Sequence, residues 1–219
     1  MNLSKELNNL SENFQKDTDE SVQEKMRDGH DVLAKKNVAD SALTVNDTFP
    51  SFALPQIDGS EFSSKEALKN KRFLIVSFYR GGWCPYCQTE LKALNEYLER
   101  FEKYGAGLIA LTPEKITKAQ ETQKEYAPNI EIAHDEKCNF AQKVGLAFEL
   151  PDTLKKTYKN DLDIDVEEFN GENDFRLPVP ATYVLDSEHK VIKCHVDIDY
   201  KNRLDPDEII EFLSEQKNH

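Results

Sequence analysis

The 219-residue sequence predicts an α/β domain preceded by a helical arm. Short apolar runs at 73–79 and 107–112 are typical of strands that are buried on both faces. Between such runs, apolar residues recur every three or four positions, which is the pattern of amphipathic helices. This alternation of strands and helices along the chain is typical of α/β architecture. We therefore expect an arm over residues 1–43 and a single domain over residues 44–219.

The arm is predicted to be helical because it contains no proline and keeps a helical apolar spacing. Leu3, Leu7, Leu10 and Phe14 follow that spacing, and Val22 and Met26 continue it. Gly29 is expected to divide the run into two helices. The apolar face predicts that the arm lies on its own domain or on a second subunit, and an arm of this kind favours a homodimer.

The domain's elements are expected in a regular order. An extended segment at 48–55 and a turn at 57–60 precede the strand at 73–79. The remaining elements are a helix with apolar residues at 91–101, a strand at 107–112, a helix at 114–126, a strand at 130–133, a helix at 139–144, strands at 181–185 and 190–196, and a helix at 206–214. Residues 145–178 are expected to form a long functional loop or mobile insertion with one helix near 152–158.

Charge and hydropathy restrict the classes of function. Lys and Arg number 28 and Asp and Glu 41, so the net charge is −13, which disfavours binding to nucleic acid or to an anionic membrane. No apolar stretch approaches the ~20 residues that span a bilayer. The first residues alternate leucine with charged residues and lack the apolar block of a signal peptide. These features favour a cytoplasmic protein.

The strongest chemical signal is the cysteine pair in Cys84-Pro85-Tyr86-Cys87. It follows a predicted strand and the Gly81-Gly82 turn, and Pro85 suits the first position of a helix. Cys84 would then be the helix N-cap, where free backbone N–H groups and the helix dipole favour a thiolate. Arg80 would add a cation if it folded back over the turn. Two thiols at this spacing can also close a disulfide.

Two other interpretations of the pair are weaker. The thiols could be buried neighbours without chemistry, but the glycines, Pro85 and adjacent Trp83 all suit a redox site. A zinc site would need two more ligands, and the remaining candidates are isolated in the sequence: Cys138, Cys194, His134 and His195. Cys138 is expected to be a packing residue or else a third, resolving thiol, and Cys194 a buried small hydrophobic residue. We therefore expect no metal and no cofactor.

The segment from Trp83 to Cys87 resembles the active site of the thioredoxin superfamily, and CPYC is similar to a glutaredoxin-type site. The opening at 44–55, Asp58-Gly59, the segment FLIVSFYRGGWCPYCQTEL and the closing strand at 180–186 are similar to the alkyl hydroperoxide reductase/thiol-specific antioxidant family of peroxiredoxins. The similarity extends from about 44 to 215 and is greatest to a subgroup that carries RGGWCPYC. It implies a thioredoxin fold, with a central mixed sheet between helices.

The sequence departs from the peroxiredoxin pattern Pro-x-x-x-Thr-x-x-Cys. Aligned to it, the peroxidatic cysteine corresponds to Cys87, the threonine to Cys84 and the proline to Arg80. The family's strand arginine is replaced by Pro180, where thioredoxins place a cis-proline that faces the cysteine pair. Arg80 is the candidate to supply the missing cation, with Arg176 as a distant second. The strand at 73–79 also lacks the buried acid of thioredoxins.

The resemblance implies reduction of hydrogen peroxide or organic hydroperoxides through a Cys84–Cys87 disulfide, which thioredoxin, glutaredoxin or glutathione would reduce. The N-cap position favours Cys84 as nucleophile, whereas the peroxiredoxin alignment favours Cys87. Trp83 would pack beside the disulfide. Pro180 and the missing peroxidase residues instead favour a reductase of protein or glutathione disulfides. A non-enzymatic redox sensor, in which the disulfide alters the contacts of the arm, is the third hypothesis.

Overall fold

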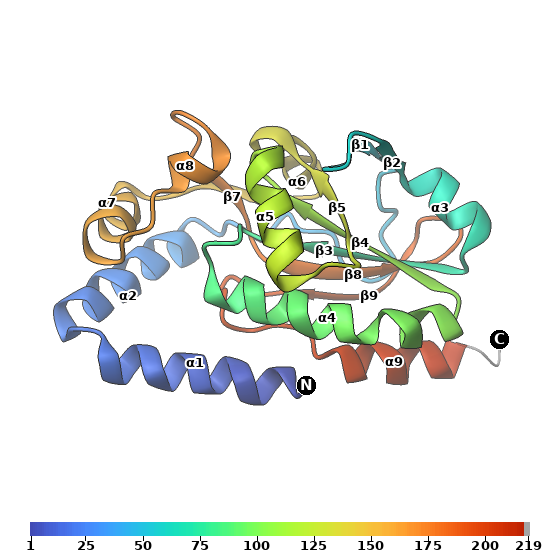
Figure 1. The fold of residues 1–219 in the computed structure, drawn as a ribbon, viewed down its shortest axis with the longest axis horizontal. Helices are drawn as coiled ribbons and strands as arrows, with labels where there is room; N and C mark the ends of the chain where they lie inside the picture. Colours follow the sequence, from blue (N-terminus) through green and yellow to red (C-terminus); the bar gives the residue numbers. More distant parts are fainter. Residues whose placement is uncertain (217–219) are drawn as a thin grey trace.

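The computed structural model describes residues 1–216 and has a central five-stranded sheet flanked by helices (Figure 1). The strand order is β5-β4-β3-β8-β9, with β3 parallel to β4 and antiparallel to β8. The strands are β1 (Ala53–Pro55), β2 (Glu61–Ser63), β3 (Phe73–Phe78), β4 (Ala106–Thr112), β5 (Glu131–His134), β6 (Ala147–Glu149), β7 (Arg176–Pro178), β8 (Ala181–Leu185) and β9 (Val191–Val196). This arrangement confirms the predicted α/β class.

Helices cover both faces of the sheet. They are α1 (Leu3–Asp17), α2 (Glu20–Lys35), α3 (Ser64–Asn70), α4 (Pro85–Lys103), α5 (Ile116–Tyr126), α6 (Asn139–Lys143), α7 (Asp152–Asp161), α8 (Val166–Asn170) and α9 (Pro206–Glu215), with a short 3-10 turn at Glu136–Cys138. Helices α4 and α9 cover one face, and α3 and α6 lie over the other. The last part of the predicted domain, residues 217–219, lies outside the described residues.

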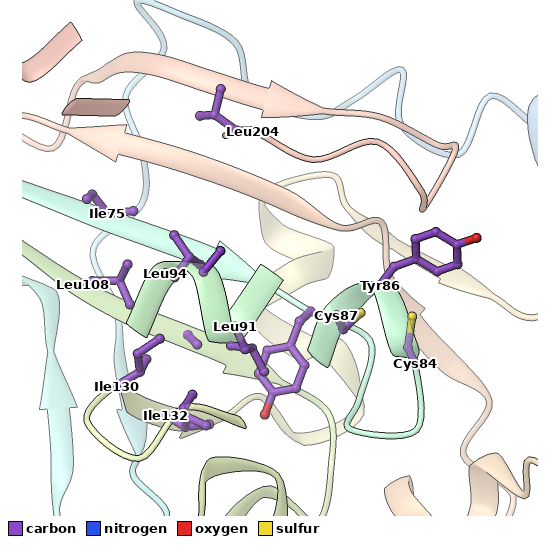
Figure 2. Packing of buried hydrophobic residues seen from close by; sticks show 14 of the residues in the cluster. Ile75, Cys84, Tyr86, Cys87, Leu91, Leu94, Leu108, Ile130, Ile132 and Leu204 are labelled. Carbon is purple, nitrogen blue, oxygen red and sulfur yellow. The ribbon is translucent and has the colours of Figure 1, made fainter. Parts of the chain in front are cut away.

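The strand at 73–79 positions the site because it is buried on both faces, as predicted. All residues of β3 are buried. Ile75 packs with Leu91 and Leu94 of α4 (Figure 2), whereas Leu74 and Val76 pack into the cluster on the opposite face. The loop that follows β3 therefore leaves a fixed strand end and leads directly into α4.

The arm lies against its own domain. Helix α1 runs along α4, and α2 packs against α7 (Figure 1). Leu3 and Leu7 of α1 are buried in the core cluster that also contains the α4 side chains. Of the two placements expected for the arm, the structure shows the one on its own domain.

The break between the two arm helices was predicted at Gly29 and is instead at Thr18 and Asp19. Gly29 lies inside α2, where a Cβ atom would be 2.3 Å from Cγ of Leu154. The glycine therefore permits the close approach of α2 to α7 rather than ending a helix.

Residues 145–178 contain more regular structure than predicted. Strands β6 and β7 form an antiparallel pair, and α7 and α8 occupy the connection between them. Strand β2 and helix α3 were not predicted, because both are short and contain too few apolar residues to show a periodic pattern. None of the described helices is both long enough and apolar enough to cross a membrane.

Replacing Gly29 with alanine tests the contact between the arm and α7. The added methyl group would collide with Leu154, so we expect a loss of about 1–3 kcal/mol in the free energy of unfolding, although alanine is the better helix former. Urea denaturation of G29A, L154A and the double variant measures this. The double variant should be more stable than the sum of the single losses predicts, and a G29A variant more stable than the parent protein would contradict the contact.

Candidate active site

Two glycines shape the loop between β3 and α4. A Cβ atom on Gly81 would lie 2.4 Å from Nε1 of Trp83, and one on Gly82 would lie 2.0 Å from Oγ1 of Thr122. The backbone N–H of Cys84 donates to the carbonyl of Gly81 at 3.1 Å, which closes the turn. The absence of side chains at both positions thus allows the loop to pack tightly before α4 begins.

Both cysteines lie at the start of α4, as predicted. Cys84 is the N-cap, with extended backbone angles, and Pro85 occupies the first helical turn. The carbonyl of Cys84 accepts the hydrogen bond from the backbone N–H of Gln88 at 3.0 Å. Figure 2 shows the two sulfur atoms in this first turn, and both cysteines are fully buried.

Arg80 folds back over the turn, as its position in the sequence suggested. Its Nη2 donates to Sγ of Cys84 at 3.0 Å, and its Nη1 donates to the hydroxyl of Tyr158 at 3.0 Å. The guanidinium carbon lies 4.1 Å from the ring centre of Tyr200 and 4.9 Å from that of Trp83. A buried cation is therefore enclosed by aromatic rings and directed at one sulfur atom.

A second arginine contacts the other thiol, and sequence reasoning missed it. Nη2 of Arg203 lies 3.5 Å from Sγ of Cys87, and its Nη1 forms an ion pair with the carboxylate of Glu90. Glu90 is buried three residues after Cys87 and also accepts a hydrogen bond from the hydroxyl of Thr182. No local pattern around Arg203 indicated this role.

The two thiols have opposite tendencies to ionise. Burial raises the pKa of Cys84, but the hydrogen bond from Cys87 and the charges of Arg80 and Arg203 outweigh it and lower that pKa well below its ordinary value. Burial and the interaction with the Cys84 sulfur raise the pKa of Cys87 well above its ordinary value. The pair therefore shares one proton, with the thiolate at Cys84 and the thiol at Cys87.

A buried acid, Glu114, holds the loop between β3 and α4 through hydrogen bonds. The Glu114 carboxylate accepts hydrogen bonds from the backbone N–H of Gly82 at 2.8 Å and from the hydroxyl of Thr122 at 3.2 Å. Burial raises its pKa. The backbone carbonyl of Glu114 in turn forms a hydrogen bond with Nδ1 of His134 at 2.6 Å. The helix predicted at 114–126 begins at Ile116, so Glu114 lies in the loop before it.

Trp83 and Pro180 also lie at the site. The Trp83 ring is buried against the ring of Tyr158, with centres 5.4 Å apart. Pro180 lines a small cavity together with Arg80. The peptide bond before Pro180 is trans, which corrects the expected thioredoxin-like cis-proline. The chain runs from β7 directly into β8 there, without the tight turn in which cis-prolines are typical.

The remaining candidates are not brought to the dithiol. Arg176 lies on β7 and acts electrostatically on Cys138, not on the cysteine pair. Cys138 is buried at the start of α6 in a left-handed conformation. Cys194 is only partly buried, contrary to our prediction, because β9 is an edge strand. Within residues 1–216, no group of three or more His, Cys, Asp or Glu side chains could hold a metal ion.

The chain matches the AhpC/TSA family over residues 45–194. The 1-Cys peroxiredoxin PER1 of Hordeum vulgare is 27% identical over 95 residues, which cover 42% of this chain and 43% of the relative. The thiol-disulfide oxidoreductase ResA of Geobacillus thermodenitrificans is 24% identical over 165 residues, which cover 75% of this chain and 76% of the relative. The chain thus spans 43% to 60% of the length of the curated peroxiredoxins that it matches.

Solved structures show the same fold. The peroxidoxin BcpB from Mycobacterium tuberculosis has a TM-score of 0.60 at 16% identity, with 79% of this chain and 97% of that chain covered. The peroxiredoxin 6 of Arenicola marina has a TM-score of 0.63 at 17% identity, with 80% and 74% covered. These matches confirm the predicted peroxiredoxin and thioredoxin type of fold.

Replacing Arg80 with methionine tests the charge on Cys84. Because Arg80 lowers the pKa of Cys84, the parent protein should hold the thiolate at a pH below the ordinary cysteine range, and R80M should shift its titration to higher pH. Ultraviolet absorbance of the thiolate against pH, with C84S subtracted, measures this without a reagent that must enter the site. R176M is the matched control, and equal titration curves for R80M and the parent protein would refute the assignment.

Proposed function

Because the chain belongs to the AhpC/TSA family, we propose that it is a thiol-dependent peroxidase of the subgroup with a CPYC site. The observation that carries this proposal is the contact between the Arg80 guanidinium and the Cys84 sulfur, at 3.0 Å. This contact supplies an activated thiolate together with a buried cation beside it. We assign Cys84 as the nucleophile and Cys87 as the resolving thiol.

The first step transfers one oxygen atom. The Cys84 thiolate attacks the terminal oxygen of the hydroperoxide, the O–O bond breaks, and the sulfur becomes a sulfenic acid. The other oxygen leaves with the bonding electrons and takes up a proton, so that the product is water or an alcohol. Nε of Arg80 is buried and has no hydrogen-bond partner within residues 1–216, so this N–H donor would be available to stabilise the charge on the leaving oxygen.

The second step closes the disulfide. Cys87 attacks the oxidised sulfur of Cys84, an S–S bond forms, and the hydroxyl leaves as water with the Cys87 proton. The charges of Arg203 and Arg80 both favour the thiolate of Cys87, which offsets part of the cost of deprotonating a buried thiol. Trp83 would pack beside this disulfide, and Pro180 would pack beside Arg80. Both would help to position the reacting groups.

The Cys84–Cys87 disulfide would have to be reduced before the next turnover. Two electrons from thioredoxin, glutaredoxin or glutathione would restore the dithiol, and a cytoplasmic location would supply them. Since both cysteines are fully buried, a protein reductant would need the site to open.

We assign residues 44–219 to the redox domain and residues 1–43 to its arm. A homodimer would form through another surface, because the arm's apolar face is occupied.

A disulfide reductase is the second candidate, and the likeness to ResA favours it. The same nucleophile, Cys84, would attack the disulfide of a protein or of glutathione, and Cys87 would resolve the mixed disulfide. The two candidates differ in the first oxidant. A peroxidase is oxidised by peroxide far faster than a simple thiol, whereas a reductase is oxidised rapidly only by a disulfide.

Stopped-flow fluorescence of Trp83, the single tryptophan, tests the proposal on the reduced protein. We expect hydrogen peroxide to oxidise the protein much faster than a free thiolate of similar pKa, and R80M to be slower by about 100-fold. C87S should still react once and stop at the sulfenic acid, whereas C84S should not react. Rapid oxidation of C84S and none of C87S would reverse the assignment. Oxidation of the parent protein no faster than a free thiolate would exclude the peroxidase.

A further inference from the structure

A cavity of about 180 Å³ lies beside the dithiol, between the arm and the domain. The site contributes Arg80, Trp83 and Pro85 to its wall, and the arm contributes Phe14 from α1 and Met26 from α2. Leu162 and Ile164, which follow α7, close another side. Among the described residues that line it, Arg80 is the only charged one, and the others are apolar side chains and three tyrosines, so the wall is mostly apolar and its one cation is the residue that contacts the reacting sulfur.

From this geometry we infer that the arm forms part of the substrate site, and that Phe14 and Met26 determine its specificity. They would select hydroperoxides that carry a compact apolar group over hydrogen peroxide. This inference rests on the proposed peroxidase function and adds to it the residues that choose among peroxides.

The cavity suits the organic part of such a substrate. The O–O bond would lie at Arg80, whose Nη2 is 3.0 Å from the Cys84 sulfur and whose Nε has no partner among the described residues. The organic group would then contact Phe14, Met26 and Trp83 and leave as the alcohol once sulfur has taken the terminal oxygen. Hydrogen peroxide has no organic group, so these apolar side chains would not stabilise it in the site. Each methylene-sized contact in an apolar pocket typically changes discrimination by ~10-fold or more.

The arm is held firmly enough to act as a wall. Leu3 and Leu7 anchor α1 to the core, and Lys25 of α2 forms an ion pair with Asp161 at the end of α7 at 2.8 Å. Both arm residues precede the segment 45–194 that matches the family, so the family match alone would not have identified them.

An outer hollow adjoins the cavity and shares part of its lining. It measures about 290 Å³, lies between the arm and the loop at 199–201, and has polar walls that include Gln15, Gln23 and Arg27. Phe14, Met26, Tyr86 and Tyr200 line both spaces. A substrate that entered through the outer hollow would therefore contact the two arm residues during entry and again in the bound position.

Matched variants in the full-length protein test the inference. F14A and M26A each remove a cavity contact, whereas L10A and V22A remove apolar side chains from the same two helices outside its wall. Reduced protein is mixed with cumene hydroperoxide or with hydrogen peroxide, and Trp83 fluorescence gives both rate constants. Urea denaturation identifies any variant that fails to fold, and F14L then replaces F14A.

We expect the parent protein to react with cumene hydroperoxide about 10-fold faster than with hydrogen peroxide. F14A and M26A should lower the cumene hydroperoxide rate about 10-fold and change the hydrogen peroxide rate less than about twofold, while L10A and V22A change neither. Equal rates for the two peroxides in the parent protein, or equal losses in cavity and control variants, would overturn the inference and leave the peroxidase function intact. If neither peroxide outpaces a free thiolate, the proposed function itself fails.

Discussion

The site depends on a charge that is almost completely removed from water. Arg80 is only 4% exposed, and its guanidinium is enclosed by the rings of Trp83 and Tyr200. Burial disfavours this cation, but the negative charge at Cys84 keeps its pKa well above the ordinary arginine value. Burying an unpaired charge costs several kcal/mol of folding free energy. The attraction between the Arg80 cation and the Cys84 thiolate offsets this cost for both groups. The low pKa of Cys84 therefore depends on the packing that holds Arg80 beside it.

A second pair keeps the two thiols different. Arg203 contacts Cys87, but Glu90 neutralises much of its charge, and both side chains are buried. Within residues 1–216, no carboxylate forms an ion pair with Arg80, which donates hydrogen bonds to the neutral hydroxyl of Tyr158 and to the sulfur of Cys84. The uncompensated cation thus lies at Cys84 and the compensated one at Cys87. This asymmetry places the thiolate at the N-cap, where the helix dipole acts in the same direction.

Local sequence signals predicted the parts of the site that are close in the chain. Gly81, Gly82 and Pro85 fix a turn and a helix start, so the position of Cys84 as the N-cap followed from their backbone preferences. Glu90 and Arg203 were not among the predicted site residues, because only their contact with each other, across 113 positions of the chain, accounts for two buried charges. Gly29 misled for the same reason: its role depends on Leu154, which is 125 positions away.

The pieces that complete the site lie outside the segment that defines the family. Residues 45–194 supply the strand, the loop and both cysteines. Tyr200 and Arg203 come after this segment, and Phe14 and Met26 come before it, yet all four surround the dithiol or its cavity. The segment that matches the family therefore explains how the thiols are presented, while the two flanks contribute to their surroundings. Two proteins that share the family segment can therefore present the same thiols in different surroundings, because the side chains of the flanks are not part of that segment.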